Sequence, residues 1–272
     1  GAKGELYVQQ SRAAWPVLEA VADAAVEAGL PRLNDFNLGD NEGVGPVHFT
    51  QKRGRRWSSA SAFLKPALRR ANLRLVTDAL VDRLTFEGKR ATGVEYEIAG
   101  QKHRARAARE VILAAGSLCT PPIMMRSGLG PAAHLRERGI ETVSDLPGVG
   151  ANLQDHLQLH LSYKLEDVRT LNDQYHSLAG RIAMGFQYAL FQRGPLSMGP
   201  SPLGMFARSD ARRDRANMAI IALPFSRDGT KATSPFHRFP GVTMNMYELR
   251  PASRGQVRLK SADAHELPEI LF

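Results

Sequence analysis

The stretch AREVILAAGSLCTPPIMMRSGLGPAAHLRERGIETVSDLPGVGANLQDH, residues 108–156, decides the fold. It contains the continuous apolar run VILAA at 111–115, which is typical of a strand buried on both faces of a parallel sheet. The run ends at Gly116, and a glycine at the carboxyl end of such a strand lets the backbone approach a nucleotide closely. A helix is predicted at about 131–138, stopped by Gly139, with a short strand at 140–143. These features predict part of a nucleotide-binding α/β unit.

Composition places the chain among ordinary globular proteins. Its 272 residues are 43% hydrophobic and 23% charged, enough material for one large domain or two smaller ones. The 36 Lys and Arg against 27 Asp and Glu give a net charge of +9. The basic residues are spread out and are not interleaved with aromatic ones, so a solvated basic surface is the preferred interpretation, and attraction of anionic ligands such as cofactor phosphates is the alternative. No nucleic-acid partner is predicted.

Cysteine usage and hydropathy indicate the compartment. The single cysteine, Cys119, excludes an internal disulfide, favours a reducing environment and is interpreted as a small buried residue. No apolar run reaches the roughly 18 residues of a membrane span, and no signal segment opens the chain. We therefore expect a cytoplasmic protein without a membrane span.

The rest of the chain has a coarse order of elements. A helix is expected at 15–29 between Pro16 and Gly29, a loop at 34–46, a short strand at 47–50 and strands at 73–81, 83–86 and 93–98. After 156 the pattern changes to strands at 157–165, 203–207, 217–224 and 242–249, with an amphipathic helix at 176–193. Residues 242–261 look like a hairpin, which predicts an antiparallel sheet.

Several catalytic and metal motifs are absent or incomplete. Gly148 and Gly150 are followed by Leu153 where a dinucleotide loop needs a third glycine, so they are interpreted as turn formers. His156 and His160 have the spacing of a helical zinc pair but lie in a strand-like context, and no metal site is predicted. Ser117 is not in a nucleophile elbow. As a bare cluster, Asn152, Gln154, Asp155 and His156 fit either a ligand site or simple loop closure.

Five blocks, in order, resemble the glucose–methanol–choline (GMC) family of FAD-dependent alcohol oxidoreductases, in its choline-dehydrogenase-like and alcohol dehydrogenase branch. They are GVGPVHFTQKRGRRWSSASAFL (43–64), NLRLVTDALVDRLTFEGKRATGVEY (72–96), EVILAAGSLCTPPIMMRSGLG (110–130), DLPGVGANLQDHL (145–157) and SRGQVRLKSAD (253–263).

The resemblance implies an α/β plus α+β fold, with part of a Rossmann-type FAD-binding domain and a substrate domain built on an antiparallel sheet flanked by helices. It implies a substrate-domain or linker segment at 1–71, part of the FAD domain at 72–156 and part of the substrate domain at 157–272. It also implies hydride transfer from a small-molecule alcohol to the flavin N5. By position, the implied cofactor contacts are Val81 at the adenine, Ala115 and Gly116 at the adenosine, and Asn152, Asp155 and His156 in the interdomain loop.

The chain departs from the family pattern at both ends. The N-terminal G-x-G-x-x-G segment and the C-terminal catalytic His pair are missing, so no catalytic residue is assigned. Gln158, an expected substrate contact, stands where choline-oxidising members tend to carry a carboxylate, and Ser61 stands where many carry Arg. We expect the central portion of an oxidoreductase, inactive alone and completed by the rest of its own chain, with an unknown electron acceptor. The alternatives are a non-catalytic FAD- or nucleotide-binding module completed by another polypeptide, and a basic nucleic-acid-binding protein.

Overall fold

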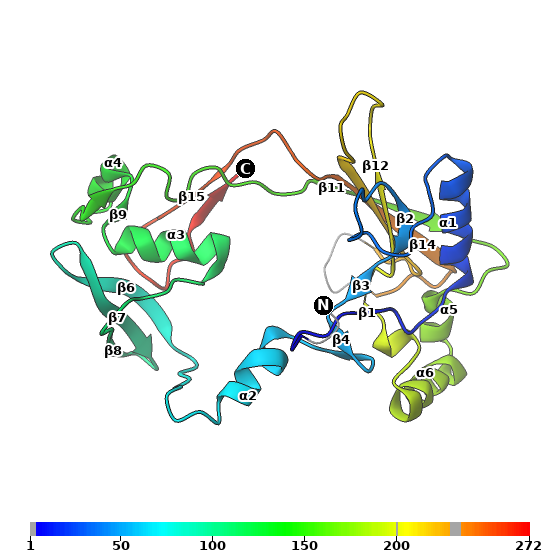
Figure 1. Cartoon of the computed structure of the whole chain (residues 1–272), viewed down its shortest axis with the longest axis horizontal. Helices are drawn as coiled ribbons and strands as arrows, with labels where there is room; N and C mark the ends of the chain where they lie inside the picture. Colours follow the sequence, from blue (N-terminus) through cyan, green and yellow to red (C-terminus); the bar gives the residue numbers. More distant parts are fainter. Residues whose placement is uncertain (1–3, 200, 229–234) are drawn as a thin grey trace. The chain divides into compact units, whose positions relative to one another are not determined.

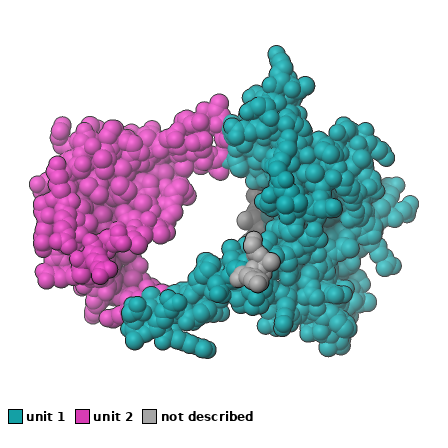
Figure 2. All heavy atoms as spheres, in the orientation of Figure 1, with its two compact units in different colours: residues 1–73, 156–250 teal, residues 74–155, 251–272 magenta. Residues whose placement is uncertain are grey.

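The computed structural model describes residues 4–199, 201–228 and 235–272, and it divides into two compact units (Figures 1 and 2). Unit 1 comprises residues 1–73 and 156–250, and unit 2 comprises residues 74–155 and 251–272. The sequence expectation instead grouped 251–272 with the second half of the chain. The contacts of that segment are with 74–155, because Leu259 joins Met125 and Leu135 in one buried cluster.

Unit 1 is built on a five-stranded antiparallel sheet in the order β11-β14-β13-β12-β2. Its strands are β2 (Gly43–Pro46), β11 (Gln158–Lys164), β12 (Leu203–Ala207), β13 (Met218–Leu223) and β14 (Gly241–Glu248). Two short pairs accompany it, β1 (Gln9–Gln10) with β3 (His48–Phe49) and β4 (Gln51–Lys52) with β5 (Arg55–Arg56). The predicted antiparallel sheet and the mixed α/β class are confirmed.

Helices flank this sheet. The predicted helix at 15–29 is α1 (Pro16–Glu27), and its buried face packs on the sheet through Val17, Leu18, Ala22 and Ala25. Pro16 suits the first helical position because its missing N–H has no intrahelical acceptor there. The others are the π-helical turn η1 (Ala60–Leu64), α2 (Lys65–Ala67), α5 (Leu171–His176), α6 (Leu178–Phe191) and the 3-10 turn η2 (Pro195–Ser197).

Unit 2 holds the meander β6 (Leu80–Glu87), β7 (Arg90–Ile98) and β8 (Gln101–Arg106), all antiparallel. Around it lie α3 (Gly116–Arg126), α4 (Ala132–Glu137), a parallel pair of β9 (Leu129–Gly130) with β10 (Ser144–Asp145), and an antiparallel pair of β15 (Gln256–Arg258) with β16 (Glu269–Leu271). The predicted turn at Glu87-Gly88 and the helix near 131–138 are confirmed.

The buried strand predicted at VILAA, residues 111–115, does not form. Residues 111–114 form no strand, and Ile112 is 79% exposed. A strand buried on both faces needs a neighbour on each side, and none of the described residues supplies one. Cys119, expected to be buried, is exposed on α3. The strand expected at 140–143 is also wrong, since the short parallel strand lies at 144–145.

Four other boundaries differ from expectation. The loop at 34–46 ends early, because Gly43 and Gly45 let β2 run against the backbone of Pro31 and Leu33. The strand expected at 73–81 begins only at Leu80. The helix expected at 176–193 is α6, which begins at Leu178 after the N-cap Ser177, and the separate helix α5 that ends at His176 was not predicted. The hairpin expected at 242–261 does not form, because β14 pairs in unit 1 whereas β15 pairs with β16 in unit 2.

Among the described residues, none of the helices has both the length and the apolar character that a membrane crossing requires.

Candidate functional site

Helix α3 fixes two of the predicted cofactor residues at its beginning. Ala115 is the N-cap and Gly116 the first helical residue, and both are exposed. Gly116 has φ +84, a conformation that other residues rarely adopt, and a Cβ built there would meet nothing within 4 Å. No side chain caps this end of the helix. The first N–H groups of α3 therefore have no side-chain acceptor at this exposed end, and a polar ligand could accept hydrogen bonds from them.

The other end of α3 fixes Val81. Arg126 Nη2 donates to the Val81 carbonyl oxygen at 3.3 Å, and Arg126 Nε donates to the Asp82 carbonyl oxygen at 2.9 Å. Ser127 Oγ accepts from the Leu84 N–H at 2.8 Å. The register of β6 against β7 shifts between Val81 and Arg83. The hydrogen bonds from Arg126 therefore hold β6 at a bulge. Val81 and Gly116 are thus held by opposite ends of one helix.

The loop at 145–156 carries the next two predicted residues. Asp145 Oδ1 accepts from the Ala132 N–H at 3.0 Å, and Leu153 exchanges two backbone hydrogen bonds with Gly255 at 2.9 and 2.7 Å. Between these anchors, Asn152 adopts φ +61 and is exposed. Asp155 is also exposed, at the end of this segment of unit 2.

His156 and Gln158 belong to unit 1. The His156 ring stacks on Tyr247 with centroids 4.9 Å apart, and its Nε2 lies 3.3 Å from the Leu249 carbonyl oxygen. Gln158 opens β11, is exposed and pairs with Tyr247 in the sheet register. His160, by contrast, holds Asn245 Oδ1 at 2.6 Å through Nδ1. Of the seven predicted contacts, five therefore lie in unit 2 and two in unit 1.

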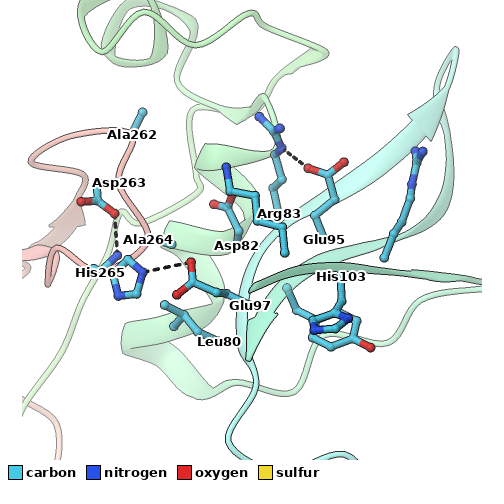
Figure 3. A pocket seen from close by; sticks show the side chains of 13 residues that line it. Leu80, Asp82, Arg83, Glu95, Glu97, His103, Ala262, Asp263, Ala264 and His265 are labelled. Carbon is cyan, nitrogen blue, oxygen red and sulfur yellow. Dashed lines mark hydrogen bonds and ion pairs between the residues drawn. The ribbon is translucent and has the colours of Figure 1, made fainter. Parts of the chain in front are cut away.

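A charged hollow of about 530 Å³ lies on unit 2 between the β6–β8 meander and residues 262–265 (Figure 3). Glu97 Oε2 lies 3.2 Å from His265 Nε2, and Arg83 Nε donates to Glu95 at 2.8 Å. The His103 ring stacks on Tyr96. None of the predicted site residues lines this hollow, and two of its charged pairs, Arg83 with Glu95 and His265 with Glu97, are formed between its own residues. Within the described ranges no cluster of His, Cys, Asp and Glu could hold a metal ion.

Three residues that bear on the predicted site escaped sequence reasoning. Arg126 ends α3 and Ser127 follows it without any distinguishing sequence pattern, and the hydrogen bonds that hold β6 join residues far apart, 44 positions for Arg126 and Asp82. Gly150 was interpreted as a turn former, yet a Cβ there would lie 2.2 Å from the Val257 carbonyl oxygen. A glycine with a packing role gives no local signal in a single sequence.

The residues present are compatible with a dinucleotide. Unit 2 offers the uncapped beginning of α3, an exposed positive-φ glycine with space above it and the bulged backbone at Val81. These supply N–H donors and a close backbone approach, which phosphate and adenosine groups require. The Asn152 and Asp155 side chains add polar groups from the loop.

Comparisons with known proteins agree with a family of FAD-dependent enzymes. The family profile described as GMC oxidoreductase matches residues 2–158. The chain is 39% identical over its whole length to an oxygen-dependent choline dehydrogenase of Brucella canis, covering 49% of that protein. It is 40% identical over 93% of its length to the enzyme of the same description from Stenotrophomonas maltophilia, covering 45% of it. The chain thus spans about half the length of the curated relatives it matches.

Solved structures show the same fold. Formate oxidase of Aspergillus oryzae superposes with a TM-score of 0.88 at 25% identity, over 99% of this chain and 52% of that one. Pyridoxine 4-oxidase, described as from Mesorbium loti, superposes with a TM-score of 0.81 at 25% identity, over 98% of this chain and 48% of that one. The profile match and the relatives together establish that the chain belongs to the GMC oxidoreductase family.

Proposed function

We propose that the complete protein is an FAD-dependent oxidoreductase of alcohols, and that this chain carries part of its FAD site and part of its substrate domain. The observation that carries the proposal is the arrangement of α3, which presents the open backbone of Gly116 at one end and holds the β6 bulge at Val81 with the other. Unit 2 corresponds to the cofactor domain in this proposal, and the antiparallel sheet of unit 1 to the substrate domain.

The residues of this chain bind and orient the cofactor. Ala115 and Gly116 take the adenosine side through the first N–H groups of α3, and the Val81 backbone takes the adenine. Asn152 and Asp155 supply polar contacts from the loop, and His156, stacked on Tyr247, continues that loop into unit 1. FAD, when bound, supplies the hydride acceptor. The residues that move protons belong to the part of the protein outside this chain, so the isolated chain is expected to be inactive.

Gln158 shapes the choice of alcohol. It is exposed at the first position of β11, and a neutral amide gives no electrostatic attraction to a quaternary ammonium. We therefore expect an uncharged alcohol to be oxidised better than choline. A Gln158→Glu variant of the full-length enzyme is expected to lower KM for choline while leaving KM for an uncharged alcohol nearly unchanged.

The test compares the full-length protein with residues 1–272. Each is purified, incubated with FAD and desalted, and its visible spectrum is recorded before and after anaerobic addition of a series of alcohols. The full-length protein is expected to retain flavin and to bleach with an alcohol. Flavin that no alcohol bleaches would favour the non-catalytic FAD-binding alternative, and turnover by residues 1–272 alone with an artificial acceptor would show that the catalytic groups lie within this chain.

A further inference from the structure

Helix α6 of unit 1 exposes a row of large apolar side chains to water. We call this row the α6 stripe; its members, each between 52% and 67% exposed, are Leu178, Ile182, Phe186, Leu190 and Phe191. The first four recur every four residues, so they lie along one side of the helix. On the inner side only Met184 is buried. The stripe therefore forms a contiguous apolar surface on one element, which soluble surfaces rarely expose without a partner.

The sequence of α6 and of the segment that follows it is basic, and Asp173 lies in α5, just before α6. From Gln174 to Ser209 the sequence contains no Asp or Glu, whereas Arg181 and Arg193 lie within and just after α6. Both arginines are exposed. The macrodipole places partial negative charge at the C-terminal end of α6, so the positive charge at that end comes from the basic side chains alone.

A second basic element abuts the end of α6. The β4–β5 hairpin turns at Gly54, and a Cβ built there would lie 2.1 Å from the Gln192 carbonyl oxygen. The hairpin thus packs directly on the residue that caps α6. Its own exposed side chains are Arg53, Arg55 and Arg56. The apolar stripe is therefore bordered, at its Leu190–Phe191 end, by a cluster of arginines from a distant part of the sequence.

We propose that the α6 stripe docks the protein on an anionic lipid surface, with α6 lying in the plane of the headgroups. Leu, Ile and Phe side chains on one face of a helix lower their free energy by entering the boundary between headgroups and acyl chains. Flanking arginines add attraction to anionic headgroups, about 1 kcal/mol for each basic residue near the surface. A nucleic acid would use the arginines but not the aliphatic side chains, and an acidic peptide would leave most of the row in water. This surface is independent of the oxidation chemistry proposed above.

The test is co-sedimentation of the full-length protein with lipid vesicles. Vesicles of phosphatidylcholine alone are compared with vesicles containing phosphatidylglycerol, at low and high salt. The protein is expected to bind the anionic vesicles, less so at high salt. The double variant Phe186→Ser, Leu190→Ser is expected to bind roughly ten- to hundredfold more weakly. The triple variant Arg53→Gln, Arg55→Gln, Arg56→Gln should lose the preference for anionic lipid.

The matched control is Leu38→Ser, because Leu38 is 82% exposed in unit 1 but lies in a loop outside α6. It should bind vesicles like the parent protein. A second readout places a polarity-sensitive fluorophore on Leu190→Cys in a background where Cys119, the one cysteine of residues 1–272, and any cysteine in the rest of the protein are replaced by Ser. Its emission should shift to the blue with anionic vesicles.

Three results would overturn the proposal. The first is no binding to either vesicle type with the labelled Leu190 position already shielded, which would mean that another part of the full-length chain covers α6. The second is binding that the serine variants do not weaken. The third is concentration-dependent self-association that the serine variants abolish while vesicles have no effect, which would make α6 a contact between copies.

Discussion

Arg126 on α3 and Asp82 on β6 are joined twice: the Arg126 Nε donates to the Asp82 carbonyl oxygen at 2.9 Å and lies 3.2 Å from the carboxylate Oδ1. The Arg126 side chain is only 6% exposed, so this is a charged group held inside unit 2 by specific partners. A buried arginine is tolerated where its donors are satisfied. This one fixes a strand bulge next to a predicted cofactor contact, which ties the stability of unit 2 to the shape of that backbone.

Arg126→Leu is expected to lower the free energy of unfolding of unit 2 by about 2–4 kcal/mol, because it leaves the Val81 and Asp82 carbonyls and the Asp82 carboxylate without their donor. Urea unfolding measures the change. The matched control is Arg83→Leu. Arg83 forms an ion pair with Glu95, and both side chains are partly exposed. That change should lower the free energy of unfolding by no more than about 1 kcal/mol. Equal losses for the two variants would contradict a special role for Arg126.

Gly148 and Gly150 provide a matched pair within one motif. A Cβ at Gly150 would lie 2.2 Å from the Val257 carbonyl oxygen and 2.5 Å from Met125 Cε, at φ +79, whereas a Cβ at Gly148 would meet nothing within 4 Å. Gly150→Ala must therefore push β15 away from α3 and is expected to cost about 2 kcal/mol or more. Gly148→Ala should be nearly neutral. Thermal unfolding of both variants distinguishes a packing role from a turn-forming one.

His134 gives unit 2 a dependence on pH. It is 3% exposed, and its Nε2 accepts from the Leu259 N–H at 3.2 Å. Burial lowers the pKa of His134 below its usual 6.5; Arg258 and Arg138 lower it further, while Glu137 and Glu269 oppose them. The unfolded chain therefore takes up a proton at this residue before the folded chain does. The stabilisation is fully present above the usual pKa and is lost as pH falls from about 6.5 toward the lower folded value.

Amide hydrogen exchange at Leu259 is the specific measurement for this effect, because protonated Nε2 would face the Leu259 N–H as a second donor. Protection of that amide should fall below about pH 6.5. In a His134→Gln variant, the neutral side chain should abolish this fall. A variant that kept the same pH dependence would show that another group causes it.

Gly116 tests the cofactor site through its backbone. Gly116→Ala and Gly139→Ala both place a methyl group at positive φ, at +84 and +68, with nothing within 4 Å. Their conformational cost should be similar, about 1–2 kcal/mol. Only the methyl group at Gly116 would lie in the proposed FAD site. In the full-length protein, flavin fluorescence titration should show FAD binding roughly tenfold weaker for Gly116→Ala and unchanged for Gly139→Ala.

The fold was predictable wherever local pattern and burial coincide. Helix α1 and strands β12 to β14 follow from apolar periodicity, because each contributes buried residues to the same core. The apolar pattern gave a wrong prediction at VILAA. It is typical of a strand with a neighbour on each side, and no described residues pair with it. The pattern also failed at 242–261, where adjacent strands in sequence belong to different units. Local periodicity carries no information about which strand pairs with which.

The candidate site divides in the same way. The sequence alone determined the family resemblance, because motifs are local properties of the chain, and that resemblance is the source of the proposal that Val81, Gly116 and Asn152 contact the cofactor. Only the tertiary structure decided that Arg126 holds the β6 bulge, that Gly150 makes room for Val257, and that the arginines of the β4–β5 hairpin border α6. Each of these is a contact between residues far apart in sequence, and such contacts exist only once the chain has closed around them.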